Sequence, residues 1–427
     1  MRTYSDLPRL AVRFGNDSPS SRLINPAASG SYQLVWIIDS TEPDLGQMGR
    51  LLERYGPVVD IAGLDVRAAA ELLRREAPIG ITTFDEELIC STAALADASG
   101  LPYYDLRTTT NLTSKSAQRA ALAEAGISVP SYLVAPAGCD VAALGALVDE
   151  VGFPCVLKPR IGSGSRDTFL IRSASDMDAA VSEVGPTALT GDMVFEGYLA
   201  DDEDFDDVFA GYLSVECLVF EGEVHAITTT GRFPPVAPFR ESGFFIPSTL
   251  EGERLREVVD LASISAQALG ITDGSLHTEI KLTPDGPRLI EVNGRPGGGI
   301  PQMLSSISDI DLFRETLLIA GGDFVPPSQP ILDRVAYLFY VHPPVGRAVV
   351  SEVRGLDRLT ELPGVEDVFL NRPPGTTLDW RDGNHGYLYS VQGIVASHDE
   401  LRAFSRELSQ IVTVDFVRGT VEPLPRI

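Results

Sequence analysis

Residues 275 to 299 read Ser-Leu-His-Thr-Glu-Ile-Lys-Leu-Thr-Pro-Asp-Gly-Pro-Arg-Leu-Ile-Glu-Val-Asn-Gly-Arg-Pro-Gly-Gly-Gly. Two runs that alternate polar and apolar residues flank the segment Thr-Pro-Asp-Gly-Pro at positions 283 to 287. Pro, Asp and Gly favour a tight reversal of the chain. The stretch therefore predicts two antiparallel strands joined by a turn.

Successive side chains of a strand point to opposite faces, so each predicted strand has a polar and an apolar face. The faces of the first strand are expected to be His277, Glu279 and Lys281 on one side, and Ile280 and Leu282 on the other. Those of the second strand are expected to be Leu289, Glu291 and Asn293 on one side, and Ile290 and Val292 on the other.

A turn centred on Asp285 pairs Glu279 directly with Glu291. Two carboxylates at cross-strand distance repel each other and destabilise a hairpin unless a cation lies between them. The amide oxygen of Asn293 adds a third hard oxygen ligand, and such a set suits Mg²⁺ that is shared with phosphate groups. A solvated polar face is the alternative interpretation, but the facing acids and the Arg295 that follows favour a metal site.

The size and charge of the chain limit what it can be. With 427 residues, 44% of them hydrophobic, the chain can bury more than one core. Its formal net charge of −26 and its pI near 4.5 argue against a nucleic-acid partner, because a general phosphate-backbone binder needs the opposite charge. Acidity of this size mainly promotes solubility.

The cysteines Cys90, Cys139, Cys155 and Cys217 are scattered without paired spacing, so neither a zinc site nor a disulfide framework is indicated. We interpret them as buried thiols in a reducing compartment. The first residues lack the apolar core of a signal peptide, and no apolar run approaches the roughly 18 residues of a membrane span. The sequence therefore predicts a cytoplasmic protein without a membrane partner.

Residues 1 to about 105 alternate short β-rich runs with amphipathic helical runs, as a parallel α/β unit does. The predicted strands are Leu10 to Phe14, Leu34 to Asp39, Val58 to Ile61 and Ile79 to Phe84. The predicted helices are Leu45 to Tyr55, Val66 to Glu76 and Glu87 to Ser99. No Gly-x-Gly-x-x-Gly follows the first strand, so a dinucleotide-binding role has little support.

Two lysines lie beside segments that could hold phosphate. A capped helix is predicted from Asn111 and is stopped by Gly126; it carries Lys115 near its start. Lys158 ends a predicted strand and is followed by the Gly/Ser loop 162 to 165, whose N–H groups and hydroxyls suit a phosphate chain. The loop is not a P-loop, because Gly-Lys-Ser/Thr is absent. A solvated lysine and a plain loop are the alternatives.

The remaining segments predict ordinary secondary structure. Residues 213 to 220 and 223 to 230 predict a hairpin that turns at Glu221-Gly222, and residues 201 to 207 predict a solvated acidic loop. Residues 255 to 269 predict an amphipathic helix. After the Pro-rich stretch 325 to 330, a small α+β unit is predicted from strands at 334 to 341, 349 to 353 and 365 to 369 and a helix at 400 to 412.

These residues resemble the ATP-grasp superfamily. A glutamate on one strand followed by Leu-Ile-Glu-Val-Asn-Gly-Arg at 289 to 295 is similar to its magnesium-binding strands, and Phe-Pro-x-Val-x-Lys-Pro at 153 to 159 is similar to its lysine strand. Within the superfamily, His-Thr-Glu-Ile-Lys at 277 to 281 is most similar to the L-amino acid ligases, which join two amino acids into a dipeptide. The resemblance covers essentially the whole chain.

The resemblance implies a multidomain α/β and α+β protein with an ATP-grasp fold. Four domains are expected: a Rossmann-like N-terminal α/β domain at 1–105, a central ATP-grasp subdomain with a phosphate lid at 106–195, a second ATP-grasp subdomain with the metal and substrate site at 196–328, and a small C-terminal α+β domain at 329–427.

The resemblance also implies which residues bind ATP. They are Lys115 and Lys158 at the phosphates; Gly162, Ser163 and Ser165 in the lid; Glu196, Tyr198 and Leu199 at the linker that holds adenine; and Glu203 at the ribose. Glu203 is one choice within the acidic run, and its neighbours are alternatives.

Substrate and metal residues are implied in the same way: Glu241, Ser242, Arg295 and Gly298 for the substrate, and Glu279, Glu291 and Asn293 for the metal. Arg295 and Lys158 are the implied catalytic residues, since a guanidinium fork can hold a carboxylate and later an oxyanion beside the γ-phosphate. A surface ion pair of Arg240 with Glu241 is the alternative. Phe244 stands where related enzymes carry a histidine, which implies a more apolar pocket.

The implied function is an ATP- and Mg²⁺-dependent carboxylate–amine ligase that forms a dipeptide through an acyl phosphate. Two Mg²⁺ ions are expected, with Mn²⁺ as an alternative, and the partners are small-molecule amino acids or related carboxylates and amines. A homodimer is left open. The competing hypotheses are another ATP-grasp reaction, such as carboxylation or ligation of a specialised metabolite, and a nucleotide-binding protein without turnover.

Overall fold

The computed structural model describes residues 7–136, 138–139, 141–162, 164–184, 192–202, 205 and 208–418. Two of the predicted site residues, Ser163 and Glu203, lie outside the described residues.

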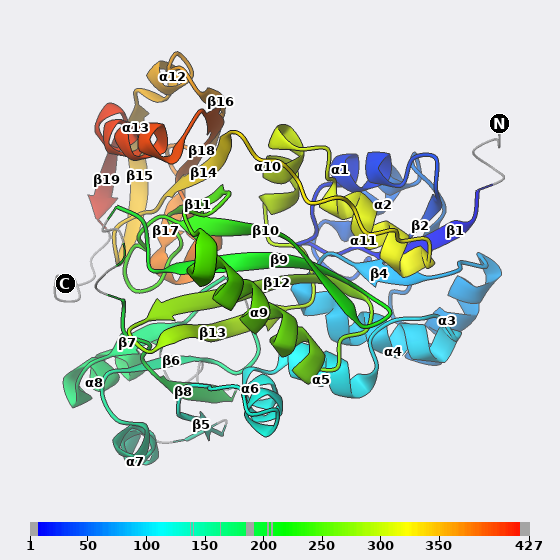
Figure 1. Cartoon of the computed structure of the whole chain (residues 1–427), viewed down its shortest axis with the longest axis horizontal. Coiled ribbons are helices and arrows are strands. Elements are labelled where there is room, and N and C mark those ends of the chain that lie inside the picture. The colour runs from blue at the N-terminus through cyan, green and yellow to red at the C-terminus, as the bar shows by residue number, and fades with distance from the viewer. Residues whose placement is uncertain are drawn as a thin grey trace.

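The N-terminal part is a parallel sheet in the order β3-β2-β1-β4, with helices on both faces (Figure 1). Its elements are β1 (Arg9–Arg13), β2 (Gln33–Ile38), β3 (Val58–Asp60), β4 (Ile81–Thr83), α1 (Ser21–Ala27), α2 (Leu45–Leu52), α3 (Val66–Arg75) and α4 (Ile89–Ser99). Both faces are apolar, as in sheets covered on two sides: Trp36 packs in the core under α1 and α2, and Val35 in the core under α3 and α4. The predicted α/β unit is confirmed, with strands and helices within a few residues of their expected ends.

A later helix completes this N-terminal core. Helix α11 (Leu312–Gly321) contributes Phe313 and Leu317 to the same cluster as Trp36. Phe313 meets Phe84 edge to face, with ring centroids 5.3 Å apart. The packing therefore joins a segment more than 200 residues away in sequence to the first sheet, which the local pattern of residues does not reveal.

A small antiparallel sheet, β5-β8-β6-β7, forms a separate lobe with two helices. Its elements are β5 (Tyr132–Ala135), β6 (Cys155–Pro159), β7 (Phe169–Ile171), β8 (Met193–Gly197), α7 (Val141–Val151) and α8 (Ala174–Val184). Trp380, from near the C-terminus, is buried in the core of this lobe, which we call the small lobe.

The largest sheet has eight antiparallel strands in the order β13-β12-β9-β10-β11-β14-β18-β16 (Figure 1). The strands are β9 (Tyr212–Phe220), β10 (Glu223–Arg232), β11 (Gly243–Ile246), β12 (Gly274–Thr283), β13 (Gly286–Asn293), β14 (Val335–Val341), β16 (Val365–Leu370) and β18 (Tyr389–Val395). Three of these strands follow residue 328, so one sheet runs across the expected boundary at 328/329. The four-domain division stays a prediction.

Helices cover the large sheet, and a smaller sheet follows it. The helices are α5 (Leu106–Thr113), α6 (Lys115–Glu124), α9 (Gly252–Ala268) and α10 (Ile300–Ile307). The smaller sheet consists of β15 (Arg347–Arg354), β17 (Thr377–Asp379) and β19 (Thr413–Arg418). The C-terminal helices are α12 (Leu356–Leu359) and α13 (His398–Ile411). The one helix expected from Asn111 is two helices, because Ser114 leaves helical geometry and caps α6, accepting from the N–H of Ala117. Lys115 is therefore the first residue of α6.

The β12–β13 hairpin pairs Glu279 with Glu291, as predicted. The strand faces predicted for Leu289 and Ile290 are wrong. A β-bulge lies where the register shifts between Glu279 and Ile280, so the strands pair Ile280 with Leu289 and leave Ile290 as the extra residue. One extra residue reverses the faces beyond it. Leu289 is consequently buried in the apolar core, while Ile290 lies on the side of Glu291 and lines a cavity.

Two of the cysteines differ from expectation. Cys155 and Cys217 are buried, as predicted, but Cys90 is exposed and Cys139 is half-buried. All four are free thiols. Among the helices of the described part of the chain, none combines the length and apolar content that crossing a membrane requires.

The bulge predicts different consequences for two adjacent substitutions. Leu289→Ala should lower the free energy of unfolding by about 2 to 5 kcal/mol, because it empties a fully buried site. Ile290→Ala should cost about 1 kcal/mol, because that side chain is half-buried at a cavity wall. Urea denaturation of both variants measures the difference. Equal losses, or a larger loss for Ile290→Ala, would contradict the observed register.

Candidate functional site

A cavity of about 530 Å³ lies between the small lobe and the β12–β13 end of the large sheet. Strand β6 and the loop after it form one wall, and β12 and β13 form the facing wall. Residues that follow β8 close one end. The cavity therefore brings together segments that the sequence holds more than 100 residues apart.

Most of the predicted site residues meet here. The described ones that line this cavity are Lys115, Lys158, Gly162, Ser165, Glu196, Tyr198, Leu199, Glu241, Glu279 and Glu291. Asn293 lines an adjoining cavity of about 430 Å³, which shares Lys115 and Glu291 with the first. Arg295, Ser242 and Gly298 line neither cavity. The Ser242 hydroxyl instead donates to the carbonyl of Pro234, at 2.7 Å.

Buried charges gather around Glu196 on β8. Its carboxylate accepts two hydrogen bonds from Arg119, both at 3.1 Å, and pairs with the Lys158 ammonium at 2.7 Å. Burial alone would raise the pKa of Glu196, but the two cations outweigh it and lower the pKa to about 2. Burial lowers the pKa of Lys158, and Glu196 counteracts this. Glu196, which was predicted at the adenine linker, thus holds Lys158 in place.

The cluster has spare capacity for an anion. Two basic side chains face one carboxylate, and Nη1 of the buried Arg119 has no hydrogen-bond partner among the described residues. A buried guanidinium nitrogen without a partner is costly. Because Arg119 and Lys158 both line the cavity, an anionic group there would balance the excess positive charge of the cluster.

Lys115 connects the Gly/Ser loop that follows β6 to the β12–β13 hairpin. Its ammonium donates to the carbonyl of Gly162 at 2.7 Å and lies 3.3 Å from the carboxylate of Glu291. Its backbone N–H donates to the carbonyl of Arg160 at 3.0 Å. The first turn of α6 is therefore fixed against the loop that follows Lys158, which places both predicted lysines on one cavity.

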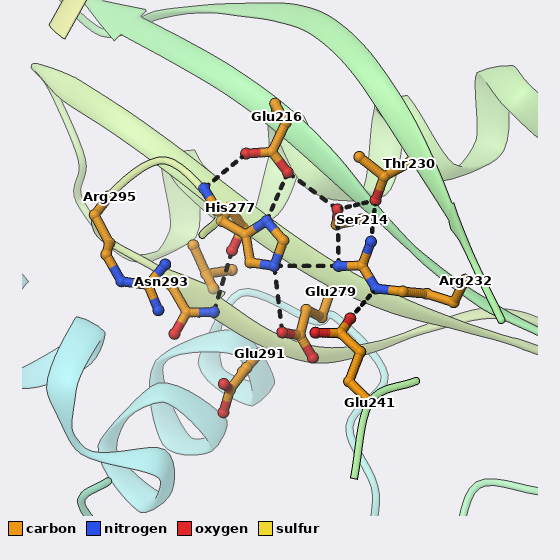
Figure 2. Close-up of polar contacts among 12 residues, drawn as sticks. Ser214, Glu216, Thr230, Arg232, Glu241, His277, Glu279, Glu291, Asn293 and Arg295 are labelled. Atoms are coloured by element: carbon orange, nitrogen blue, oxygen red, sulfur yellow. Dashed lines mark hydrogen bonds and ion pairs between the residues drawn. The ribbon is translucent and has the colours of Figure 1, made fainter. Parts of the chain in front are cut away.

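Glu279 belongs to a buried chain of alternating charges that Figure 2 shows. His277 donates from Nδ1 to Glu216 at 2.6 Å, and its Nε2 lies 3.3 Å from Glu279. Burial lowers the pKa of His277, but the two carboxylates outweigh it and raise the pKa to about 9. In return, the pKa of Glu279 falls to about 2 despite burial, chiefly because of His277. With Nε2 protonated, its 3.4 Å approach to Arg232 is a packing contact between cations rather than a hydrogen bond.

The hairpin offers donors that fit a hard divalent cation. Glu279 and Glu291 are direct cross-strand partners, and His277 is paired with Asn293. Asn293 donates from Nδ2 to the carbonyl of His277 at 3.4 Å, which leaves its amide oxygen as the acceptor end (Figure 2). Two carboxylates and an amide oxygen are the donor chemistry of Mg²⁺. Within the described ranges, no group of three or more His, Cys, Asp or Glu side chains is placed to hold a metal, so the metal role stays a prediction.

Arg295 is tied to the N-terminal domain. Its Nε lies 3.2 Å from the carboxylate of Glu86, in the 3₁₀ turn Glu86–Leu88, and its Nη1 donates to the carbonyl of Pro296 at 3.0 Å. Burial raises the pKa of Glu86 to about 7, while Arg295 lowers it in part. The predicted catalytic arginine is thus oriented by a residue more than 200 positions earlier.

Glu241 is held through its side chain and both of its backbone groups. Its carboxylate lies 2.6 Å from Nε of Arg232. Its N–H donates to Oδ1 of Asn384 at 2.8 Å, and its carbonyl accepts from Nε2 of His342 at 2.7 Å. Burial lowers the pKa of Arg232, but Glu241 and the other acidic groups around it together outweigh burial and raise the pKa above its ordinary value. The alternative of a surface pair between Arg240 and Glu241 is wrong, since Arg240 is buried and bonds to backbone carbonyls.

Several site residues escaped the sequence analysis: Glu86, Arg119, Glu216, Arg232 and Asn384. One signal was available for Glu216, because it is the only charge in the apolar run 213 to 220. A lone charge inside a buried strand needs a partner. Arg119 and Asn384 carry no such local signal, since their partners come from distant segments.

Comparison with known protein families finds an ATP-grasp domain at residues 151–303. The chain is 30% identical over 338 residues to the uncharacterized protein y4rH of Sinorhizobium fredii, a match that covers 75% of this chain and 66% of that relative. It is 24% identical over 306 residues to the L-arginine-specific L-amino acid ligase of Bacillus subtilis, covering 70% of this chain and 71% of that enzyme. The matched region is thus about two thirds of each relative's length.

Among solved structures, an L-amino acid ligase from Bacillus licheniformis superposes with a TM-score of 0.74 at 22% sequence identity. The match covers 96% of this chain and 99% of that structure. This similarity extends the shared fold beyond the matched ATP-grasp domain to almost the whole chain, and it confirms the expected multidomain architecture.

Replacing Glu196 tests the buried cluster. Glu196→Gln keeps the side-chain volume but leaves Arg119 and Lys158 without a counter-charge, so the free energy of unfolding should fall by about 3 to 5 kcal/mol. Asp192→Asn is the matched control, because its 2.8 Å pair with Arg160 is partly exposed and should cost less than about 1 kcal/mol. Chemical denaturation compares the two. Similar small losses would show that the cluster does not need the Glu196 charge.

The buried His342 should make the free energy of unfolding depend on pH. Burial lowers its pKa to about 4 from an ordinary 6.5, so the unfolded chain binds this proton first as the pH falls. The stability that the neutral His342 contributes is complete above about pH 6.5. The free energy of unfolding then falls by up to about 3 kcal/mol as the pH is lowered towards 4. His342→Gln keeps a donor for the Glu241 carbonyl but does not titrate, so its unfolding free energy should change less between pH 6.5 and pH 4. Parallel pH profiles for both proteins would contradict the prediction.

Proposed function

Since the chain is an ATP-grasp protein similar to the L-amino acid ligases, we propose that it joins the carboxylate of one amino acid to the amine of another, with ATP converted to ADP and phosphate. One observation carries the proposal. The buried cations around Lys158 face the carboxylate pair of Glu279 and Glu291 across one cavity, so groups for a phosphate chain and for its metal lie opposite each other.

We assign each part of ATP to a region of this cavity. Apolar side chains of Val156, Leu199 and Ile290 line it and suit the faces of adenine. We assign the ribose to the end that holds Asp201 and Asp202, in the acidic run where Glu203 was the expected ligand. Asp201 pairs with Lys281 and Asp202 lies 3.1 Å from Arg254, so both carboxylates are oriented.

We assign the phosphates to the wall opposite the hairpin. Lys158 and Lys115 supply ammonium groups, and Gly162, Gly164 and Ser165 line the same cavity. Arg119 also lines the cavity and adds a cation that the sequence analysis did not assign to the site. These groups neutralise phosphate charge and hold the chain of phosphates in one orientation, which is the main requirement for phosphoryl transfer.

Glu279, Glu291 and Asn293 are the residues that would hold Mg²⁺, with Mn²⁺ as an alternative ion. A bound divalent ion neutralises charge on the phosphates. The chain's own part is to orient the two carboxylates and to balance their charge. His277 lies 3.3 Å from Glu279, and Lys115 lies 3.3 Å from Glu291.

The proposed reaction has two balanced steps. An oxygen of the substrate carboxylate attacks the γ-phosphorus, the bond from that phosphorus to the bridging oxygen of ADP breaks, and an acyl phosphate forms. The neutral amine then attacks the acyl carbon, the C–O bond to phosphate breaks, and the amine nitrogen loses a proton as the amide forms. We assign to Arg295 the role of holding the reacting carboxyl group and its oxyanion. The residue lines neither cavity, and its pair with Glu86 supports the proposal only by orienting the guanidinium.

Glu241 is our candidate for the ammonium group of the carboxylate substrate. It lines the cavity, and its backbone is fixed on both sides by side chains from after residue 340. Arg232, 2.6 Å away, balances its charge, and the ring of Phe244 lies 5.1 Å from the guanidinium carbon. Phe244 is itself buried in an apolar cluster and lines neither cavity, so the more apolar pocket that this position implied stays a prediction.

The reaction is tested by measuring phosphate release with ATP and Mg²⁺ against all pairs of the twenty amino acids, with product masses read by mass spectrometry. We expect a product equal to two amino acids less water, formed in equal amount to phosphate. Reactions without an amine but with bicarbonate test carboxylation instead. Phosphate release only with bicarbonate, or none with any pair, would contradict the proposed dipeptide ligase.

Glu291→Gln tests the metal assignment. The change should lower Mg²⁺-dependent turnover by more than about 100-fold, because it removes one ligand charge. The fold should persist, because the change also relieves repulsion with Glu279. Circular dichroism and turnover are measured together, and Glu253→Gln, an exposed change on α9, is the control. Wild-type turnover in Glu291→Gln would exclude the assignment.

A further inference from the structure

A 3₁₀ segment near the C-terminus, Trp380–Gly386, lies against the small lobe. Trp380 anchors it: the side chain is 4% exposed and meets Phe169 of β7 edge to face, with ring centroids 5.7 Å apart. Because the indole is part of the small lobe's core, the segment is bound to that lobe rather than only to the C-terminal sheet.

The other end of this segment is also fixed. Asn371 donates to the carbonyl of Tyr387 at 2.9 Å, and Arg372 donates to the carbonyl of His385 at 3.2 Å. Both donors follow β16, so the segment is held between the small lobe and the large sheet. The residues at its middle, Gly383 and Asn384, are therefore presented in a defined position.

Gly383 and Asn384 contact the phosphate loop through its backbone. The N–H of Asn384 donates to the carbonyl of Gly164 at 2.9 Å. Gly383 has φ +61°, and a Cβ there would lie 2.3 Å from the same carbonyl oxygen. Only glycine permits this approach.

Asn384 contacts the substrate side at the same time. Its Oδ1 accepts from the N–H of Glu241 at 2.8 Å, and the residue lines the cavity. One residue thus fixes Gly164 through its backbone and Glu241 through its side chain.

We infer that Asn384 is a positioning residue that couples Gly164 of the phosphate-binding loop to Glu241, so that a nucleotide bound against Gly164 orders the group that receives the substrate. The inference rests on the proposed function for the role of Glu241. Coupling of this kind is reciprocal, so substrate bound at Glu241 also stabilises the nucleotide-bound loop.

The hydrogen bond from the Glu241 N–H to the Asn384 side chain is tested with Asn384→Ala and Asn384→Asp. Alanine removes the acceptor but keeps the backbone bond to Gly164, so KM for the carboxylate substrate should rise about fivefold to tenfold, whereas the Kd for ADP without that substrate should change less than about twofold. Aspartate restores the acceptor and should return KM for the carboxylate substrate to near the wild-type value. Unchanged KM values in Asn384→Ala, or no rescue by aspartate, would overturn the inference.

The backbone contact of Gly383 and Asn384 with Gly164 is tested with Gly383→Ala, whose methyl group would push the Gly164 carbonyl away. The Kd for ADP, measured by calorimetry, should rise about tenfold. Gly375→Ala is the matched control, because Gly375 also has positive φ, at +92°, but has open space around its Cβ position. Equal ADP affinities in the two variants would show that the contact with Gly164 does not position the loop for the nucleotide, and would overturn the inference.

Hydrogen exchange separates this inference from the proposed function, because it needs no turnover. In the wild type, ADP with Mg²⁺ should slow exchange in the peptide that contains Glu241. In Asn384→Ala this protection should be lost, while protection of the Gly162–Arg166 peptide remains. Equal protection at Glu241 in both proteins would overturn the inference, whereas an absence of dipeptide formation in the wild type would overturn only the proposed reaction.

Discussion

Two carboxylates that face each other across neighbouring strands set the constraint on which the candidate site depends. Glu279 and Glu291 repel at this distance, so the surrounding chain must bring cations to them. The structure does so with His277 on one side and Lys115 on the other. Because Lys115 also bonds to the Gly162 carbonyl, neutralising the hairpin fixes the phosphate loop as well.

The same principle organises the opposite wall. Lys158 and Arg119 are buried, and burial of a cation is costly unless a carboxylate pairs with it. Glu196 meets that need for both and retains a low pKa as a result. What remains is excess positive charge that faces the cavity, opposite the negative hairpin. A site with both signs arranged in this way suits a polyphosphate and its metal better than either alone.

Packing between distant segments then joins the walls. Helix α11 completes the first sheet, Trp380 completes the small lobe, and the eight-stranded sheet extends through strands that follow residue 328. Each contact ties one lobe to another, so the groups around the cavity are placed by the whole chain. Glu241 illustrates this, because residues from beyond position 340 bind both its N–H and its carbonyl.

The sequence by itself determined the element order, the α/β N-terminal part and the Glu279–Glu291 pairing, because periodicity and turn residues act locally. Lys115 and Lys158 were assigned to the site through the resemblance of their motifs to the ATP-grasp superfamily. Only the tertiary structure decided the bulge at Ile290, the split of the helix at Ser114 and the partners of Arg119, Arg295 and Glu241. A bulge changes the face of a residue without changing its composition. Buried ion pairs join residues far apart in sequence, where no local pattern records which charge meets which.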